Sequence, residues 1–192
     1  PIEPDAGHMD APLIYTYNIS PESIIHYAPN LKRDKSIFFN SLLNLVSDNS
    51  DAMNRMAQVM VSESIYTWFD ELAPWVTEIT LRSADLVNGL VEYQLKSDFD
   101  QSRWRRLRVL NLQWGGDGEQ LRELSFLKYF PDVQILNLAQ NDLTNIQELA
   151  PLYSLKDLNL KGNKLLEDID SLRELVNLNR LNLSHTSVNN LE

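Results

Sequence analysis

Side chains that could carry out a reaction are few in this sequence. The three histidines are His8, His26 and His185, and no recognisable motif places a carboxylate or a nucleophile beside any of them. The chain contains no cysteine, which excludes disulfides, thiolate metal sites and a cysteine nucleophile. We therefore expect no catalytic residues, and we predict that this chain is not an enzyme.

Two short motifs suggest a bound ligand, and each lacks a required part. The run 115–118 (Gly-Gly-Asp-Gly) has the glycines of a phosphate-binding loop, but no Lys-Ser/Thr pair follows them, which favours a simple turn. Glu167, Asp168 and Asp170 offer carboxylates without the ligand spacing of a calcium loop, which favours a solvated acidic edge. No metal and no cofactor is predicted.

An arginine-rich segment interrupts the acidic chain. Arg103, Arg105, Arg106 and Arg108 surround Trp104. Because guanidinium groups form paired hydrogen bonds with phosphate and carboxylate groups, this cluster could hold a phosphate or an acidic peptide. The alternative is a solvated helix end, where cations are favoured by the helix dipole.

Charge and composition limit the classes of partner. The 192 residues include 27 acidic and 17 basic side chains, for a formal net charge of −10, and this argues against a nucleic-acid partner. The hydrophobic fraction of 43% is typical of a globular domain. No apolar run approaches the roughly 20 residues that cross a bilayer, and no secretory signal is visible. We expect a cytoplasmic domain without membrane insertion, and the oligomeric state is left open.

The N-terminal part of the chain, up to position 33, differs in character from the rest. Residues 1–9 contain Gly-His-Met at 7–9 and are interpreted as a cloning or protease remnant. Five of the eight prolines lie between Pro1 and Pro29, so residues 10–33 are expected to be extended. We expect this segment to dock on its own chain or on a neighbouring one, because it carries seven apolar or aromatic side chains: Leu13, Ile14, Tyr15, Tyr17, Ile24, Ile25 and Tyr27.

A helical period begins near Asp34. Apolar residues recur at intervals of three and four on both sides of the turn-forming run 48–50 (Asp-Asn-Ser), and Pro74 ends the pattern. Two successive amphipathic helices indicate a helical hairpin over residues 34–75.

From residue 76 onward the chain repeats itself. Four segments share one pattern: 107–112 (LRVLNL), 133–138 (VQILNL), 155–160 (LKDLNL) and 178–183 (LNRLNL). The intervals between their first positions are 26, 22 and 23. A fifth segment, 76–81 (VTEITL), fits the same template further upstream, after a longer interval.

Further slots follow each segment. An asparagine slot is filled by Asn141 and Asn163, whereas the other repeats carry Ala84, Gly115 and Thr186 there. The next apolar slots are assigned in pairs, one from each of the two asparagine-containing repeats: Leu143 and Leu165, Ile146 and Ile169, and Leu149 and Leu172.

This pattern resembles the leucine-rich repeat, and its 22-residue spacing is most similar to the SDS22-like subclass. The resemblance covers residues 76–192 and implies an α/β solenoid of about four to five repeats with a curved parallel sheet. Since terminal repeats need covering, the hairpin over 34–75 is predicted to be an N-terminal helical cap. The pattern stops within a repeat at residues 191–192, so we interpret the C-terminal end as truncated.

The same template directs the residues between the leucines onto the concave face. The aligned asparagines are either a solvated polar ladder or a hydrogen-bonding strip for an extended peptide, and Val109, Ile135 and Trp114 could form an apolar patch. The predicted partner-binding residues are Val109, Asn111, Gln113, Trp114, Ile135, Asn137, Asp157, Asn159, Lys161, Arg180 and Asn182.

The resemblance implies protein–protein recognition. The primary hypothesis is a non-catalytic intracellular adaptor or scaffold that binds a protein or peptide on its concave face, with a cytoskeletal or spindle-pole location as one possibility. The first alternative is a secreted bacterial effector or internalin-like domain that binds a host protein. The second is a substrate-targeting domain of an enzyme whose catalytic part lies outside residues 1–192.

Overall fold

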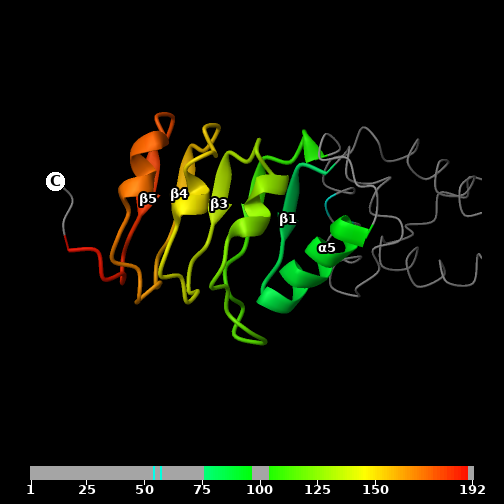
Figure 1. Ribbon diagram of the computed structural model, residues 1–192, viewed down its shortest axis with the longest axis horizontal. Helices are drawn as coiled ribbons and strands as arrows, with labels where there is room; N and C mark the ends of the chain where they lie inside the picture. The colour runs from blue at the N-terminus through cyan, green and yellow to red at the C-terminus, as the bar shows by residue number, and fades with distance from the viewer. Residues whose placement is uncertain (1–53, 55–56, 58–75, 97–103, 190–192) are drawn as a thin grey trace, which may run out of the picture.

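Five short strands form a single parallel sheet in the computed structural model, which describes Asn54, Ala57 and residues 76–96 and 104–189. Their spatial order is the order of the sequence, and Figure 1 shows them side by side from β1 on the right to β5 on the left. The strands are β1 (Glu78–Thr80), β2 (Val109–Asn111), β3 (Ile135–Asn137), β4 (Asp157–Asn159) and β5 (Arg180–Asn182).

Equivalent residues of successive repeats are neighbours across this sheet. The central leucines Leu110, Leu136 and Leu158 pair in register and are almost fully buried. Leu181 occupies the same position in β5 and is 41% exposed, because β5 is the last strand of the described sheet. The predicted α/β solenoid of leucine-rich repeats is confirmed.

A helical segment accompanies each strand-to-strand connection, and its type follows the length of the repeat. The first repeat is the longest, extending from Val76 to the start of the next repeat at Leu107, and it holds the α-helix α5 (Ala84–Lys96). The shorter repeats hold only 3-10 turns, which need fewer residues per turn: η3 (Ser125–Tyr129), η4 (Gln147–Leu149) and η5 (Asp170–Glu174). These segments form the layer opposite the sheet, and the core lies between the two (Figure 1).

A column of large side chains closes this core at the entrance to four strands. Trp104, Phe130, Leu152 and Leu175 each lie three positions before the first leucine slot of a repeat and are buried. Trp104 and Phe130 meet edge to face, with ring centroids 5.4 Å apart. The leucine template does not include this position.

Buried asparagines link successive turns of the solenoid. The Nδ2 group of Asn141 donates to the carbonyls of Leu112 at 2.8 Å and Leu138 at 3.1 Å, and its Oδ1 accepts the N–H of Leu121 at 2.9 Å. Asn163 repeats this arrangement one turn further on, with Nδ2 donating to the Leu138 carbonyl at 2.9 Å. These backbone groups have no partner within a strand, so the asparagine side chain replaces the missing hydrogen bonds.

One predicted core position is wrong. The apolar slot after Asn163 is filled by Leu166, which is fully buried, whereas Leu165 is 57% exposed. The corresponding residue in the preceding repeat, Leu143, is fully buried as predicted. The repeat that starts at Leu155 is one residue longer than the one before it, and it accommodates the extra residue just after the asparagine, which moves the buried slot on by one.

The N-terminal edge of the sheet carries a side-chain contact. Asn54 and Ala57 are both helical, and Ala57 is fully buried in the core. The Oδ1 atom of Asn54 accepts the N–H groups of Thr77 at 3.0 Å and Glu78 at 3.1 Å, so it satisfies donors at the edge of β1.

Several sequence predictions fall outside the described residues. These are the remnant at 1–9, the docked segment 10–33, the hairpin 34–75 apart from the two residues above, and the interrupted repeat at 190–192. They stay predictions.

Candidate functional site: the concave face of the sheet

Two columns of side chains run across all five strands on the concave face. The sheet register places the members of each column on adjacent strands, as the repeat template predicts. The first column consists of Glu78, Val109, Ile135, Asp157 and Arg180, and the second of Thr80, Asn111, Asn137, Asn159 and Asn182.

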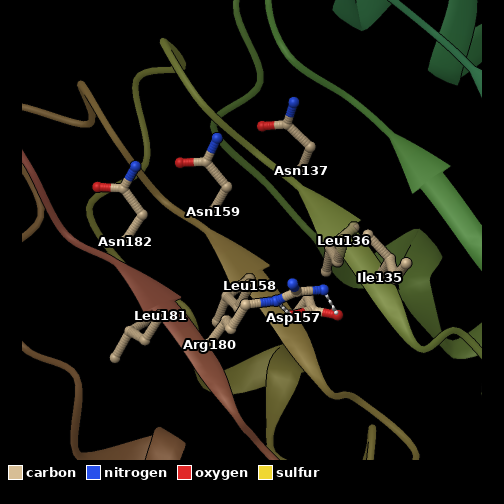
Figure 2. Close-up of a pocket in the computed structure, with 9 residues that line it drawn as sticks. All are labelled: Ile135, Leu136, Asn137, Asp157, Leu158, Asn159, Arg180, Leu181 and Asn182. Atoms are coloured by element: carbon tan, nitrogen blue, oxygen red, sulfur yellow. Dashed lines mark hydrogen bonds and ion pairs between the residues drawn. The ribbon is translucent and has the colours of Figure 1, made fainter.

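A shallow depression of about 380 Å³ lies over the last three strands. It is lined by the three residues of each strand, so it contains both columns and the central leucines beneath them (Figure 2). The lining residues are Ile135, Leu136, Asn137, Asp157, Leu158, Asn159, Arg180, Leu181 and Asn182.

An ion pair crosses from β5 to β4 in this depression. The Nη2 group of Arg180 donates to Oδ2 of Asp157 at 2.9 Å, and Nε donates to the other carboxylate oxygen (Figure 2). The Arg180 side chain is 79% exposed and that of Asp157 only 19%. The hydrogen bond from Arg180 lowers the pKa of Asp157, the nearby charge of Lys156 contributes in the same direction, and partial burial opposes both.

The second column is a row of parallel amides. Each asparagine oxygen accepts the backbone N–H two residues further along, at 3.1 Å for Asn137 and Asn159 and 3.0 Å for Asn182. Figure 2 shows these three amides in the same orientation. Each oxygen therefore helps to shape the chain after its strand, and the Nδ2 groups are the donors that the row offers to a partner.

The amide donors differ along the row. Nδ2 of Asn137 donates to Oε1 of Gln113 at 3.2 Å, and Gln113 in turn donates to Oε1 of Gln140 at 3.1 Å. Within the described part of the chain, Nδ2 of Asn159 and Asn182 has no acceptor in hydrogen-bond range. Two of the free donors, those of Asn159 and Asn182, therefore lie in the depression beside the ion pair, whereas Asn111 lies outside it.

The predicted apolar patch consists of two paired strand residues and of Trp114 in the loop that follows β2. Val109 and Ile135 are directly paired in the sheet, and Ile135 is 39% exposed. Trp114 lies five positions beyond Val109, about 16 Å along an extended chain. Its indole Nε1–H donates to the carbonyl of Gly118 at 3.1 Å, so Trp114 belongs to the glycine-rich turn.

The arginine-rich segment divides between two roles. Arg103 lies outside the described residues, and Arg105 and Arg106 are exposed. Arg108 is half-buried, and its guanidinium donates to the carbonyl of Leu107 at 2.9 Å and to that of Arg105. Arg108 therefore stabilises the turn before β2.

Lys156 was missed as a site residue. It precedes β4 at the second template position, and its charge acts on the carboxylate of Asp157. The second template position follows directly after the first leucine slot of each repeat, here Leu155. A comparison of the residues at this position in all repeats would have shown Lys156.

Metal and membrane sites are not indicated in the described residues. No group of three or more acidic or histidine side chains is placed to hold a metal ion within residues 76–96 and 104–189. In the same residues, no helix combines the length and the apolar character that a membrane span requires.

Comparison with known proteins gives distant likenesses only. No family model matches the chain, and no curated protein sequence does. The structure is similar to internalin C2 from Listeria monocytogenes, with 22% identity, 64% of this chain and 48% of that chain covered, and a TM-score of 0.49. A second internalin (inlF) from the same organism gives 20% identity, 64% and 38% coverage, and a TM-score of 0.46. The chain spans about half the length of internalin C2 and less than half the length of the second internalin. Likeness of this degree shows nothing about function.

Proposed function

We propose that this chain is a non-catalytic protein-binding module that holds a peptide or protein partner on its concave face. The observation that supports the proposal is the depression over β3, β4 and β5, where exposed Ile135, the Asp157–Arg180 pair and two free amide donors lie together. Interfaces combine such an apolar contact with orienting polar groups.

The biological setting is a further part of the proposal. We favour an intracellular adaptor or scaffold of the SDS22-like type, on the basis of the short repeat spacings of 22 and 23 and the 3-10 turns opposite the sheet. A secreted, internalin-like protein that binds a host protein would use the same face, and the cellular location of the full-length protein distinguishes the two.

Selection from a random peptide library displayed on phage tests the proposal. The selected peptides should lose most of their affinity for the variant I135E/K161E, which places two new carboxylates on the concave face. The matched control is L165E/K164E, which makes the same change of charge and polarity on exposed residues that are not among the predicted partner-binding residues. Equal loss in both variants, or loss in the control alone, would contradict a concave binding site.

A further inference from the structure

Charge is segregated between the two sides of this solenoid. We define the concave face and its rim as positions two, three, five and seven of each repeat, counted from its first leucine slot. These positions carry five basic residues and two acidic ones, a surplus of three positive charges. The other described side chains include six basic and twelve acidic ones, a surplus of six negative charges. The basic residues of the concave side are Arg82, Arg108, Lys156, Lys161 and Arg180, and the acidic ones are Glu78 and Asp157.

The acidic residue of the depression, Asp157, is already paired and mostly covered. Asp157 is largely covered and has both oxygens engaged by Arg180, whereas the Arg180 side chain is mostly exposed. A guanidinium has five N–H donors, so Arg180 retains donors that Asp157 does not use. Lys156 and Lys161 are exposed before and after the same strand, β4.

The basic residues border the path of an extended chain across the sheet on two sides. Arg108, Lys156 and Arg180 lie before or at the start of β2, β4 and β5, and Arg82 and Lys161 lie two residues after β1 and β4. They are distributed from β1 to β5, a distance of four strand spacings or about 19 Å. An extended polypeptide covers this distance with about six residues. The Nδ2 donors of Asn159 and Asn182 add hydrogen bonds for carbonyl or carboxylate oxygens along that path.

From these observations we infer that the concave face binds an acidic, extended segment of a partner protein. This inference rests on the proposed function and specifies the partner's chemistry. A polypeptide fits better than a nucleic acid because the exposed apolar side chains of the depression are Ile135 and Leu181, and neither offers a stacking surface for a base.

An oligo-glutamate peptide of about ten residues is the probe, with binding to the full chain measured by fluorescence anisotropy. We expect binding that weakens between ~0.05 and ~0.2 M salt, because exposed charges are screened in that range. An oligo-glutamine peptide of the same length should not bind measurably.

Two variants with equal charge change locate the site. K156Q/R180Q removes one charge from the depression and one from the residue that precedes β4 beside it, and it should weaken binding about tenfold. K164Q/R173Q removes the same two residue types from the outer surface, where Arg173 is also exposed and also paired with an aspartate, and should change binding less than about twofold. The single variant K156Q measures how the loss of one charge affects binding while the Asp157–Arg180 pair stays in place.

Three results would overturn the inference: equal affinity of the two double variants, absence of oligo-glutamate binding, or displacement of the peptide by a lower concentration of an oligo-uridine RNA. Failure of this inference can be separated from failure of the proposed function. Library peptides that bind the concave face but are not acidic would contradict the inference alone, whereas library peptides that bind elsewhere would contradict both.

Discussion

At the scale of single residues, the most constrained positions are those where a side chain substitutes for a backbone partner. Asn141 and Asn163 are the only buried polar residues of the described core, and each bonds to carbonyls of two successive repeats. In the last described repeat Thr186 fills the slot, and its hydroxyl donates to the Leu183 carbonyl at 2.8 Å. A hydroxyl thus performs part of the asparagine's role.

Replacement of Asn163 by alanine should lower the free energy of unfolding by about 3 kcal/mol, because several buried backbone groups lose their partner. Asn163→Thr should recover part of that loss, since the hydroxyl can reach one carbonyl. Urea unfolding monitored by circular dichroism measures both. The control is Asn179→Ala on an exposed residue, and a similar cost at Asn179 would contradict a specific role for the slot.

Backbone conformation predicts that replacing glycine by alanine changes the stability in opposite directions at two positions. Gly162 has φ of +80° at a position where Gln140 and His185 also have positive φ, so Gly162→Ala should destabilise the fold by about 1 kcal/mol. Gly89 lies within α5, where alanine is the better helix former, so Gly89→Ala should stabilise by up to about 1 kcal/mol. Thermal unfolding of the two variants tests this contrast, and shifts of the same sign would refute it.

At the scale of elements, the strands are too short to be stable alone, and contacts between adjacent repeats specify the sheet. The pair formed by Asp157 of β4 and Arg180 of β5 is one such contact and is the only one that joins two described strands by an ion pair. Its effect on stability depends on the ionisation of Asp157.

Because the pKa of Asp157 is lowered in the folded protein, its pair with Arg180 should contribute fully above the ordinary carboxyl value of 3.8. As the pH falls below that value the unfolded chain takes up a proton first, and the contribution is lost as the pH passes through the folded pKa. The stability difference between wild type and Asp157→Asn should therefore narrow below pH ~4. Chemical unfolding at a series of pH values measures it, and a constant difference down to pH ~3 would contradict the assignment.

At the scale of the whole molecule, one continuous core connects the repeats from Val76 to Leu175. Each repeat contacts its neighbours alone, so stability depends on the sum of the interfaces between repeats. A strongly destabilising substitution at one end of the described solenoid should therefore also lower the stability of the neighbouring repeats.

Trp104→Ala should cost about 3–5 kcal/mol, because it removes a fully buried side chain packed on Phe130. Trp114→Ala is the matched control, and it should cost less because that indole is half-buried. Hydrogen exchange of the Leu112 and Leu138 amides should accelerate in the first variant. Unchanged protection at Leu138 would show that the repeats unfold independently.

The sequence by itself predicted the architecture and the order of side chains on the concave face. A repeat with leucines at fixed intervals specifies both the strand and the face that each side chain takes, because alternation in a strand is a local property of the backbone. The five strands and the asparagine slot could be predicted without coordinates because the repeats resemble the leucine-rich repeat.

Only the tertiary structure decided the contacts between repeats and the places where longer repeats accommodate their extra residues. Leu166 takes the core position that was predicted for Leu165 because the longer repeat places its extra residue just after the asparagine. The periodicity of the sequence does not specify that place. The hydrogen bonds of Trp114 and Arg108 and the pairing of Asp157 with Arg180 depend on groups brought close by folding. Local sequence determines which face a side chain occupies, whereas its partners are determined by distances that exist only in the folded solenoid.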